Sequence, residues 1–316
     1  MSVERTQIPT LYNEGVMTRV DTTKTSRSGG QTTSRVYEVD HLTEDYGQLP
    51  SVTSVIGDNL RNFGIEIWSK QWIERGLEEA IDQPMTQDRV DQILRASSQE
   101  ADQSAQIGTD LHDYIEKMLA GKPLPLIATH GQLAPAIEGF RRWQERFRHW
   151  TLVGSEVGVW ANNPLTAGTV DAVFQDTDGS LIVCDWKTSS GIFESSLIQV
   201  SAYAYAVYLM ARNHYLYSGN ADPANVPSRV RCMVVRFDND YPRDDRGKKI
   251  RTEPKVFTDQ VEYVEFDNQF SSQEMGNRDY VVHAVGQWFN AYKALRYIHQ
   301  VKKERIKKVK LESAVV

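Results

Sequence analysis

The chain has 316 residues, of which 40% are hydrophobic and 25% are charged, and its formal net charge is -6. These values are typical of a globular protein with one large domain or two modest ones. The two cysteines, Cys184 and Cys232, exclude a four-cysteine zinc or iron–sulfur site within the chain and favour a reducing compartment. No apolar run approaches the roughly 20 residues that a membrane span needs, and residues 1–10 lack the apolar core of a secretory signal. We therefore expect a cytoplasmic protein without a membrane partner.

Residues 1–48 are predicted to form a polar N-terminal segment with a β-hairpin. The stretch 21–34 is rich in Thr, Ser and Gly, and its flanks 16–20 and 34–40 alternate between apolar and polar side chains. A helix is expected to follow, capped by Ser51 or Thr53 and continuing to about Leu60.

Residues 49–150 are predicted to be a helical region. Ile107, Leu111, Ile115 and Leu119 recur every four residues, which indicates one apolar stripe of a helix that ends before Gly121.

A further helix is expected over residues 135–147, and it carries a basic and aromatic cluster. The arginines are Arg141, Arg142, Arg146 and Arg148, and they are interleaved with Phe140, Trp143, Phe147 and Trp150. The cluster suits single-stranded nucleic acid, because bases stack on aromatic rings and phosphates pair with arginine. The alternative, which we prefer, is a helix with an aromatic core face and a solvated arginine face.

Residues 151–300 are predicted to form the core of an α/β fold. Short strands are expected over 152–160, 168–175, 181–187, 230–237 and 255–266, with helices over 197–211 and 272–300. This order predicts a mixed central β-sheet flanked by helices, joined to the helical N-terminal part.

Residues 301–316 are predicted to be a basic C-terminal tail. The stretch 296–310 holds seven basic residues and one acidic residue, or +6. Phosphate binding is one interpretation. A solvated helix end and a disordered tail are the alternatives.

The segment 168–187 is predicted to be a hairpin that brings three charged residues together. Asp178-Gly179 is a turn signal between two apolar runs. A three-residue loop, 177–179, places Asp171 opposite Asp185, whereas a loop of two or four residues shifts this register by one. Lys187 follows Asp185 by two residues and therefore points to the same face.

This arrangement predicts a divalent metal site. Two carboxylates inside apolar strands repel each other unless a cation or a proton lies between them. Mg²⁺ takes one or two protein carboxylates together with water and substrate phosphate, and it lowers the pKa of its bound water. A lysine beside it can orient that water or offset charge on a phosphate, so the set suits phosphodiester hydrolysis. The alternative is a solvated hairpin with scattered charges, which fits Asp176 and Asp178.

With its flanking residues, the hairpin resembles the PD-(D/E)XK nuclease superfamily, and within it the RecB-type exonucleases. The core motif is matched by Asp171 followed by Asp185-Trp186-Lys187, where the family often has Glu in place of Asp185. Gln199 to Tyr203 match the Q-x-x-x-Y helix, and Gly108 to His112 match the G-x-x-x-H helix. Residues 50–53, followed by a Trp-bearing helix, are similar to the small stand-alone phage exonucleases and the mitochondrial genome-maintenance exonuclease.

The resemblance implies a restriction-endonuclease-like core and a role for each matching residue. Asp171, Asp185 and His112 would be metal ligands, and Lys187 would be the catalytic lysine. Glu156 lies where the family often has a further acidic residue that binds the metal or orients its water. Gln199 and Tyr203 would position DNA or the lysine. The alternatives are a buried structural His112, a surface Glu156 and a core Tyr203.

The function implied by the resemblance is an Mg²⁺-dependent DNA exonuclease, with Mn²⁺ able to substitute. It would prefer single-stranded DNA or DNA ends, and it would act in replication, recombination or repair, with proteins of those pathways as partners, in a bacterial or phage setting. No iron–sulfur cluster and no nucleotide cofactor are expected, since the chain lacks a phosphate-binding G-x-x-x-x-G-K-[ST] loop. The alternatives are a structure-specific endonuclease of the same fold and a non-catalytic DNA-binding recombination protein.

Overall fold

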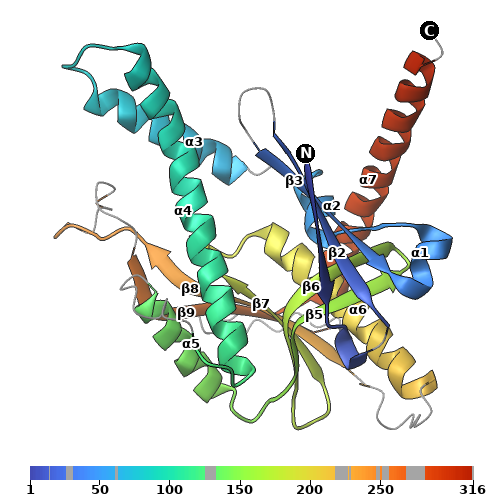
Figure 1. Ribbon diagram of the computed structural model, residues 1–316. Helices are drawn as coiled ribbons and strands as arrows, with labels where there is room; N and C mark the ends of the chain where they lie inside the picture. Colours follow the sequence, from blue (N-terminus) through green and yellow to red (C-terminus); the bar gives the residue numbers. More distant parts are fainter. Residues whose placement is uncertain are drawn as a thin grey trace.

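The computed structural model describes the chain except for residues 14, 26–30, 61–62, 125–132, 218–226, 228, 247–249, 251–255, 268–281 and 315–316. The backbone but not the side chains is described at residues 31, 63–69, 97–101, 239–240, 256–267, 282–287 and 306–314. The described residues form two β-sheets, with helices on and around them (Figure 1).

The first sheet is N-terminal, antiparallel and ordered β1-β2-β3-β4. Its strands are β1 (Ser2–Ile8), β2 (Met17–Thr25), β3 (Gln31–Val39) and β4 (Leu49–Pro50). The predicted hairpin is confirmed as the β2–β3 pair, in which Val20 lies opposite Val36. The strands are longer than predicted, and β1 and β4, which were not predicted, extend the pair into a sheet.

The central sheet has six strands in the order β10-β9-β8-β7-β6-β5. They are β5 (Thr151–Asn162), β6 (Leu165–Gln175), β7 (Leu181–Lys187), β8 (Val230–Asp240), β9 (Val256–Asp267) and β10 (Val282–Ala284). The β7–β8 and β9–β10 pairs are parallel and the others are antiparallel, so the mixed sheet is confirmed. The parallel β7–β8 pair requires a crossover, which contains α6 (Glu194–Tyr217).

Each face of the central sheet is covered by an apolar core. On β7, Leu181 and Val183 join the core that includes α6, whereas Ile182, Cys184 and Trp186 join the core formed with α4 (Gln87–Leu119) and α5 (Ala134–Arg146). Because successive strand residues point to opposite faces, a strand buried on both faces is a continuous apolar run. Asp185 is the polar exception within this run.

The α5 aromatics belong to the second core. Phe140, Trp143 and Trp150 are buried, whereas the Arg148 side chain is 77% exposed and pairs with Glu145. The interpretation with an aromatic core face is therefore confirmed, and these rings are not available for base stacking.

The remaining helices are α1 (Asp40–Tyr46), α2 (Val52–Gly57), α3 (Phe63–Glu79) and α7 (Val285–Ala314), with a short 3-10 helix at Leu11–Asn13. The helix predicted to continue to Leu60 ends at Gly57. Ser51 precedes it, but its hydroxyl bonds to the Thr53 hydroxyl and caps no backbone N–H. None of the helices in the described part of the chain is both long and apolar enough to cross a bilayer.

The C-terminal helix differs from the prediction at both ends. It begins at Val285, after β10, and it continues to Ala314, so the predicted tail is helical over most of its length. A three-residue strand is too short to show a period of two, and the Lys- and Glu-rich stretch contains good helix formers without Gly or Pro. Residues 272–281 of the predicted helix lie outside the described residues. The division of the chain at residues 48, 150 and 300 stays a prediction.

Candidate active site

The hairpin turn has the predicted geometry. Gly179 has a φ of +80°, and the Asp176 N–H donates to the Ser180 carbonyl at 2.9 Å, which closes a three-residue loop over 177–179. The pairing of β6 with β7 runs from Gln175–Leu181 to Ala172–Cys184, so that Asp171 is next in register with Asp185. Regular pairing stops there, because the Trp186 N–H donates to Asp171 Oδ2 at 2.7 Å.

Three carboxylates lie on three neighbouring strands. Asp171 is on β6, Glu156 is on β5 and Asp185 is on β7. Glu156 and Asp171 are flanked by the pairs Ser155–Ala172 and Val157–Val170 but are not themselves a regular pair. The strand pairing is thus interrupted on both sides of Asp171, at the point where these acidic side chains gather.

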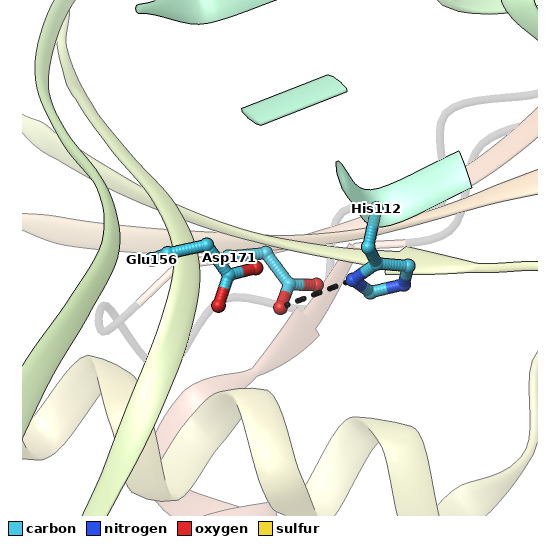
Figure 2. Close-up of side chains that lie close together, drawn as sticks. All are labelled: His112, Glu156 and Asp171. Carbon is cyan, nitrogen blue, oxygen red and sulfur yellow. Dashed lines mark ion pairs between the residues drawn. The ribbon is translucent and has the colours of Figure 1, made fainter. Parts of the chain in front are cut away.

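His112 reaches the carboxylates from α4 (Figure 2). One ligand atom each of His112, Glu156 and Asp171 can be chosen so that all three lie within 4.8 Å of one another, and His112 Nδ1 is 3.6 Å from Asp171 Oδ1. His112 Nε2 is 3.1 Å from the Trp186 carbonyl, which can only accept, so Nε2 carries the proton. Nδ1 therefore faces the carboxylates. Burial lowers the pKa of His112, but the Asp171 carboxylate outweighs it and raises the pKa to about 9.

Gly108 explains why the G-x-x-x-H spacing brings α4 close to the sheet. It lies one helical turn before His112 and therefore on the same side of α4. A Cβ at position 108 would lie 3.1 Å from Thr188 Oγ1, just after the end of β7. Absence of a side chain at Gly108 thus permits the approach that places His112 beside Trp186 and Asp171.

Glu156 combines a strained backbone with a crowded carboxylate. Its φ of +49° is in the left-handed region, which costs a non-glycine residue about 1 kcal/mol or more. Burial and the neighbouring charge of Asp171 raise the pKa of Glu156 to about 8. The residue is half-buried and not fully exposed.

Asp185 and Lys187 form a partly buried ion pair at the end of β7. Lys187 Nζ lies 2.9 Å from Asp185 Oδ1 and 2.7 Å from Oδ2, and Gln199 Nε2 donates to Oδ1 at 3.1 Å. Burial and the charge of Asp171 raise the pKa of Asp185 to about 6, against the opposing effect of Lys187. Burial lowers the pKa of Lys187, but the two carboxylates outweigh it and raise the pKa. Asp185 Oδ2 is buried, and Lys187 Nζ at 2.7 Å is its ion-pair partner.

Tyr203 lies behind this pair and is 3% exposed. Its ring occupies the space beside Gly168, where a Cβ would clash with Tyr203 Cε1. Burial raises the pKa of Tyr203 well above its ordinary value, and the hydrogen bond with Gln199, one turn earlier, opposes this effect. Such burial leaves little surface for DNA and fits a role through Gln199.

The N-terminal sheet adds residues that the sequence interpretation missed. The Tyr37 hydroxyl lies 3.2 Å from Thr169 Oγ1, and Thr169 precedes Asp171 by two residues on β6. The positive charge of Arg19 on β2 lowers the pKa of Glu156, against the larger effects that raise it. The only signal in the sequence was the alternation of polar residues in the two N-terminal strands, which does not indicate where the hairpin packs.

The donor set fits a divalent cation. Carboxylate oxygens and an imidazole nitrogen are ligands of Mg²⁺ or Mn²⁺ sites. The carboxylates are so close that their negative charges repel each other unless a cation or a proton lies between them. Asp185, which was also predicted to be a metal ligand, is not part of this three-residue group and is paired with Lys187.

Family comparison identifies the fold that carries this centre. The model of the PD-(D/E)XK nuclease superfamily matches residues 71–273, which is more than half of the chain and includes every site residue discussed above except those of the N-terminal sheet. The chain belongs to the PD-(D/E)XK nuclease superfamily. Members of this superfamily are nucleases that use divalent metal ions, so the chain is a nuclease with DNA as its expected substrate class. No curated protein matches the chain significantly.

Proposed function

We propose that this PD-(D/E)XK nuclease is a RecB-type DNA exonuclease. It hydrolyses phosphodiester bonds with Mg²⁺, for which Mn²⁺ substitutes, and acts on single strands or DNA ends in replication, recombination or repair. The observation that carries the proposal is the position of Asp171. It has ligand atoms of His112 and Glu156 within 4.8 Å, and it is next in register with Asp185.

His112, Glu156 and Asp171 would hold the metal ion, with Asp185 as a further ligand. The ion would supply an acidified water molecule and stabilise negative charge on phosphorus. The backbone of Trp186 holds two of these groups in place, because its N–H binds Asp171 and its carbonyl binds His112. Such outer contacts orient ligands and keep the imidazole in one tautomer.

Lys187 supplies the fixed positive charge of the centre. Asp185 holds Lys187, and Gln199 in turn donates to Asp185 Oδ1. The Lys187 side chain is 23% exposed, so the ammonium group can reach a phosphate oxygen or the attacking water from a recessed position. A charged donor preorganised at the reacting phosphate stabilises the charge that develops there.

The burial of the carboxylates supports a preference for single strands or frayed ends. The side chains of Asp171 and Asp185 are 13% and 2% exposed. A phosphate of a stacked, paired duplex has to leave its neighbours to reach such a recessed group, whereas a single strand can bend into it.

The test uses Asp185→Ala and Lys187→Ala with a matched control, Lys117→Ala. Lys117 forms a Lys–Asp ion pair of 2.6 Å with Asp113 on the surface of α4, away from the reacting groups. We expect both site variants to lose cleavage of linear single-stranded DNA by at least about a hundredfold while they still bind it. Lys117→Ala should cut like wild type. Normal cleavage by both site variants would refute the assignment.

Circular single-stranded DNA separates the exonuclease from the two alternatives. A pure exonuclease leaves circles intact and degrades the same molecule after linearisation. Cleavage of circles would identify a structure-specific endonuclease. Binding without cleavage of any DNA or RNA, with Mg²⁺ or Mn²⁺ present, would identify a non-catalytic recombination protein.

A further inference from the structure

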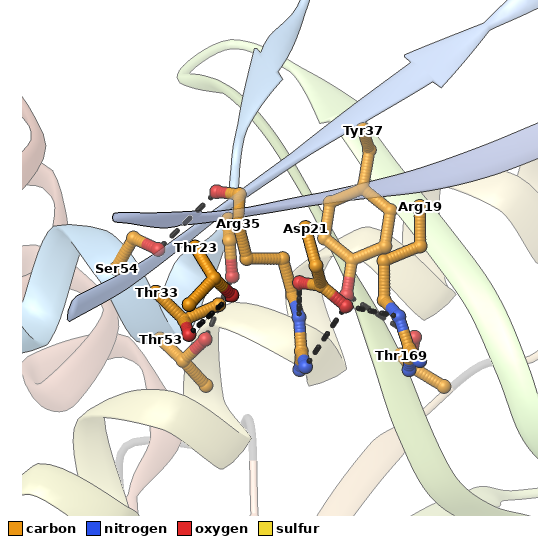
Figure 3. A network of polar contacts seen from close by, with 10 residues as sticks. Arg19, Asp21, Thr23, Thr33, Arg35, Tyr37, Thr53, Ser54 and Thr169 are labelled. Carbon is orange, nitrogen blue, oxygen red and sulfur yellow. Dashed lines mark hydrogen bonds and ion pairs between the residues drawn. The ribbon is translucent and has the colours of Figure 1, made fainter. Parts of the chain in front are cut away.

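One face of the β2–β3 hairpin is lined with polar side chains (Figure 3). The register pairs Arg19 with Tyr37, Asp21 with Arg35 and Thr23 with Thr33. Residues two apart on a strand, and residues directly opposite each other, share one face of a sheet. These six residues, Arg19, Asp21, Thr23, Thr33, Arg35 and Tyr37, are called the hairpin polar face below.

The hairpin polar face ends at the candidate active site. Tyr37 is 1% exposed, and its hydroxyl is 3.2 Å from Thr169 Oγ1. Thr169 is two residues from Asp171 on β6, so the two point to the same side of that strand. Figure 3 shows Arg19, Asp21 and Arg35 beside this contact, with Thr23 and Thr33 farther along the hairpin.

Asp21 holds the two arginines in place. Arg35 Nε is 2.8 Å from Asp21 Oδ1, and Arg19 Nε is 3.0 Å from Asp21 Oδ2. The arginine side chains are 38% and 27% exposed, whereas that of Asp21 is 12% exposed. Two guanidinium groups and one carboxylate give a net charge of +1. Each guanidinium has five N–H donors, so one carboxylate leaves several donors of the pair for another anion.

The opposite face of the same sheet shows a different arrangement. Arg5 on β1 lies opposite Val20, and its Nη1 is 2.6 Å from Glu38 Oε2. This is a one-to-one surface ion pair, which contributes little to stability and leaves no net charge. The arrangement of two arginines on one carboxylate therefore lies on the face that leads to the carboxylate centre, where the exposed Glu4 of β1 lies opposite Asp21. Two arginines in a fixed geometry suit phosphate, which they can bind through paired N–H donors.

We propose that the hairpin polar face binds the phosphate backbone of a single strand of DNA as it passes the active site. Arg19 and Arg35 contact phosphates near the scissile bond, and the Thr23 and Thr33 hydroxyl groups, which are 3.0 Å apart, contact the backbone farther away. The inference rests on the proposed function, because its ligand is the substrate of that nuclease. The strands involved lie outside the range matched by the family model, so the surface is a property of this chain and not of the matched core.

Binding of a fluorescent oligothymidylate, measured by anisotropy in EDTA, tests the inference without cleavage. The variants are Arg19→Ala and Arg35→Ala, and the matched control is Arg5→Ala. We expect each of the first two to weaken binding about tenfold, at the low end for a charge-assisted hydrogen bond, and the control to bind like wild type. The slope of log affinity against log salt should fall by about 0.7 for each arginine removed.

Arg35→Lys separates phosphate binding from a structural role of the ion pair. A lysine keeps the charge, so binding should recover most of the loss and the salt slope should return. Unchanged binding in Arg19→Ala and Arg35→Ala, or an equal loss in Arg5→Ala, would overturn the inference. If thermal unfolding shows that an alanine variant is unfolded, Arg35→Lys decides alone, and its failure to bind would refute phosphate recognition by charge.

A blunt duplex of the same base composition is the second ligand. An equal tenfold loss on the duplex would overturn the assignment to single strands. Cleavage of the linear oligonucleotide with Mg²⁺ is measured separately. If wild type binds with the expected dependence on Arg19 and Arg35 but does not cut, the proposed function fails and the binding surface stands. If wild type cuts and the variants bind normally, the binding surface is refuted and the proposed function stands.

Discussion

At the scale of single residues, Glu156 destabilises the metal-free fold in two ways. Its backbone is left-handed, and its carboxylate lies close to Asp171. Costs of this kind persist at functional sites because the local arrangement serves binding or catalysis. Glu156→Gln keeps the backbone and the shape but removes the charge. We expect the metal-free protein to gain about 1 kcal/mol of stability, and the rise in Tm caused by Mn²⁺ to shrink. Urea unfolding in EDTA and thermal unfolding with Mn²⁺ measure the two effects.

The control for this prediction is Glu145→Gln. Glu145 is exposed on α5 and pairs with Arg148, so its replacement should change stability by no more than about 0.5 kcal/mol and leave the Mn²⁺ effect intact. A Glu156→Gln variant that is less stable in EDTA than wild type would show that the carboxylate stabilises the metal-free fold.

Asp176 provides a pH-dependent prediction away from the candidate metal ligands. Partial burial raises its pKa, but the hydrogen bonds from Thr177 and Arg231 outweigh this and lower it. A carboxylate whose pKa is lowered by folding stabilises the protein above the ordinary value of about 4 and loses that contribution as the pH falls through the folded value. We expect Asp176→Asn to cost about 1 kcal/mol at pH 7, since solvent screens part of the ion pair, and much less below pH 3. Urea unfolding at both pH values measures the difference. An equal cost at both would show that charge is not involved.

At the scale of elements, the contact between α4 and β7 determines the position of His112. Gly108→Ala should favour the helix by about 1 kcal/mol, because alanine is the better helix former. The new Cβ would lie 3.1 Å from Thr188 Oγ1, so α4 has to move by a few tenths of an ångström. We expect cleavage to fall by about tenfold or more while the Tm stays or rises, because small displacements of a reacting group are costly.

A second substitution tests this explanation. Thr188→Ala removes the hydroxyl that the new Cβ would meet, so Gly108→Ala with Thr188→Ala should regain activity relative to Gly108→Ala, measured against Thr188→Ala alone. The two changes should be non-additive, as expected for residues in contact. Additive losses would place the defect elsewhere on α4.

At the scale of the whole molecule, periodicity and turn chemistry were enough to predict most of the central sheet. The strands β5 to β9 and the helix α6 lie where the sequence pattern placed them, because each combines a clear period with a stop signal. Asp178-Gly179 indicated the turn but left the loop length open, and the structure has the three-residue loop that places Asp171 next in register with Asp185. The short strands β4 and β10 have too few residues for a period, so they could not be predicted.

Only the site residues that belong to the family motifs could be predicted from the sequence. Asp171, Asp185, Lys187, Gln199 and His112 lie together in the structure, and their chemical roles stay predictions. The hairpin polar face is different, because the Tyr37–Thr169 contact joins residues 132 positions apart. Local patterns describe neighbours in sequence, and nothing in residues 17–39 indicates which part of the chain they pack against.

Docking of the N-terminal sheet on the core depends on Gly158 of β5. Its N–H donates to the Pro9 carbonyl at 2.7 Å, and a Cβ there would lie 2.7 Å from Met17 Cε, at the start of β2. Gly158→Val inserts atoms into a packed contact, which costs about 2 kcal/mol, and the strain falls on the junction between the sheets. We expect amide hydrogen exchange to accelerate across residues 17–39 more than in α6, because the junction opens before the core does. Binding of single-stranded DNA should weaken as well, since the hairpin polar face would move away from the active site.

The control is Gly57→Val, at a position with open space around the Cβ, which should change neither the exchange rates nor the binding. Unchanged exchange over residues 17–39 in Gly158→Val would mean that other contacts, such as Tyr37 with Thr169, are sufficient to hold the sheet.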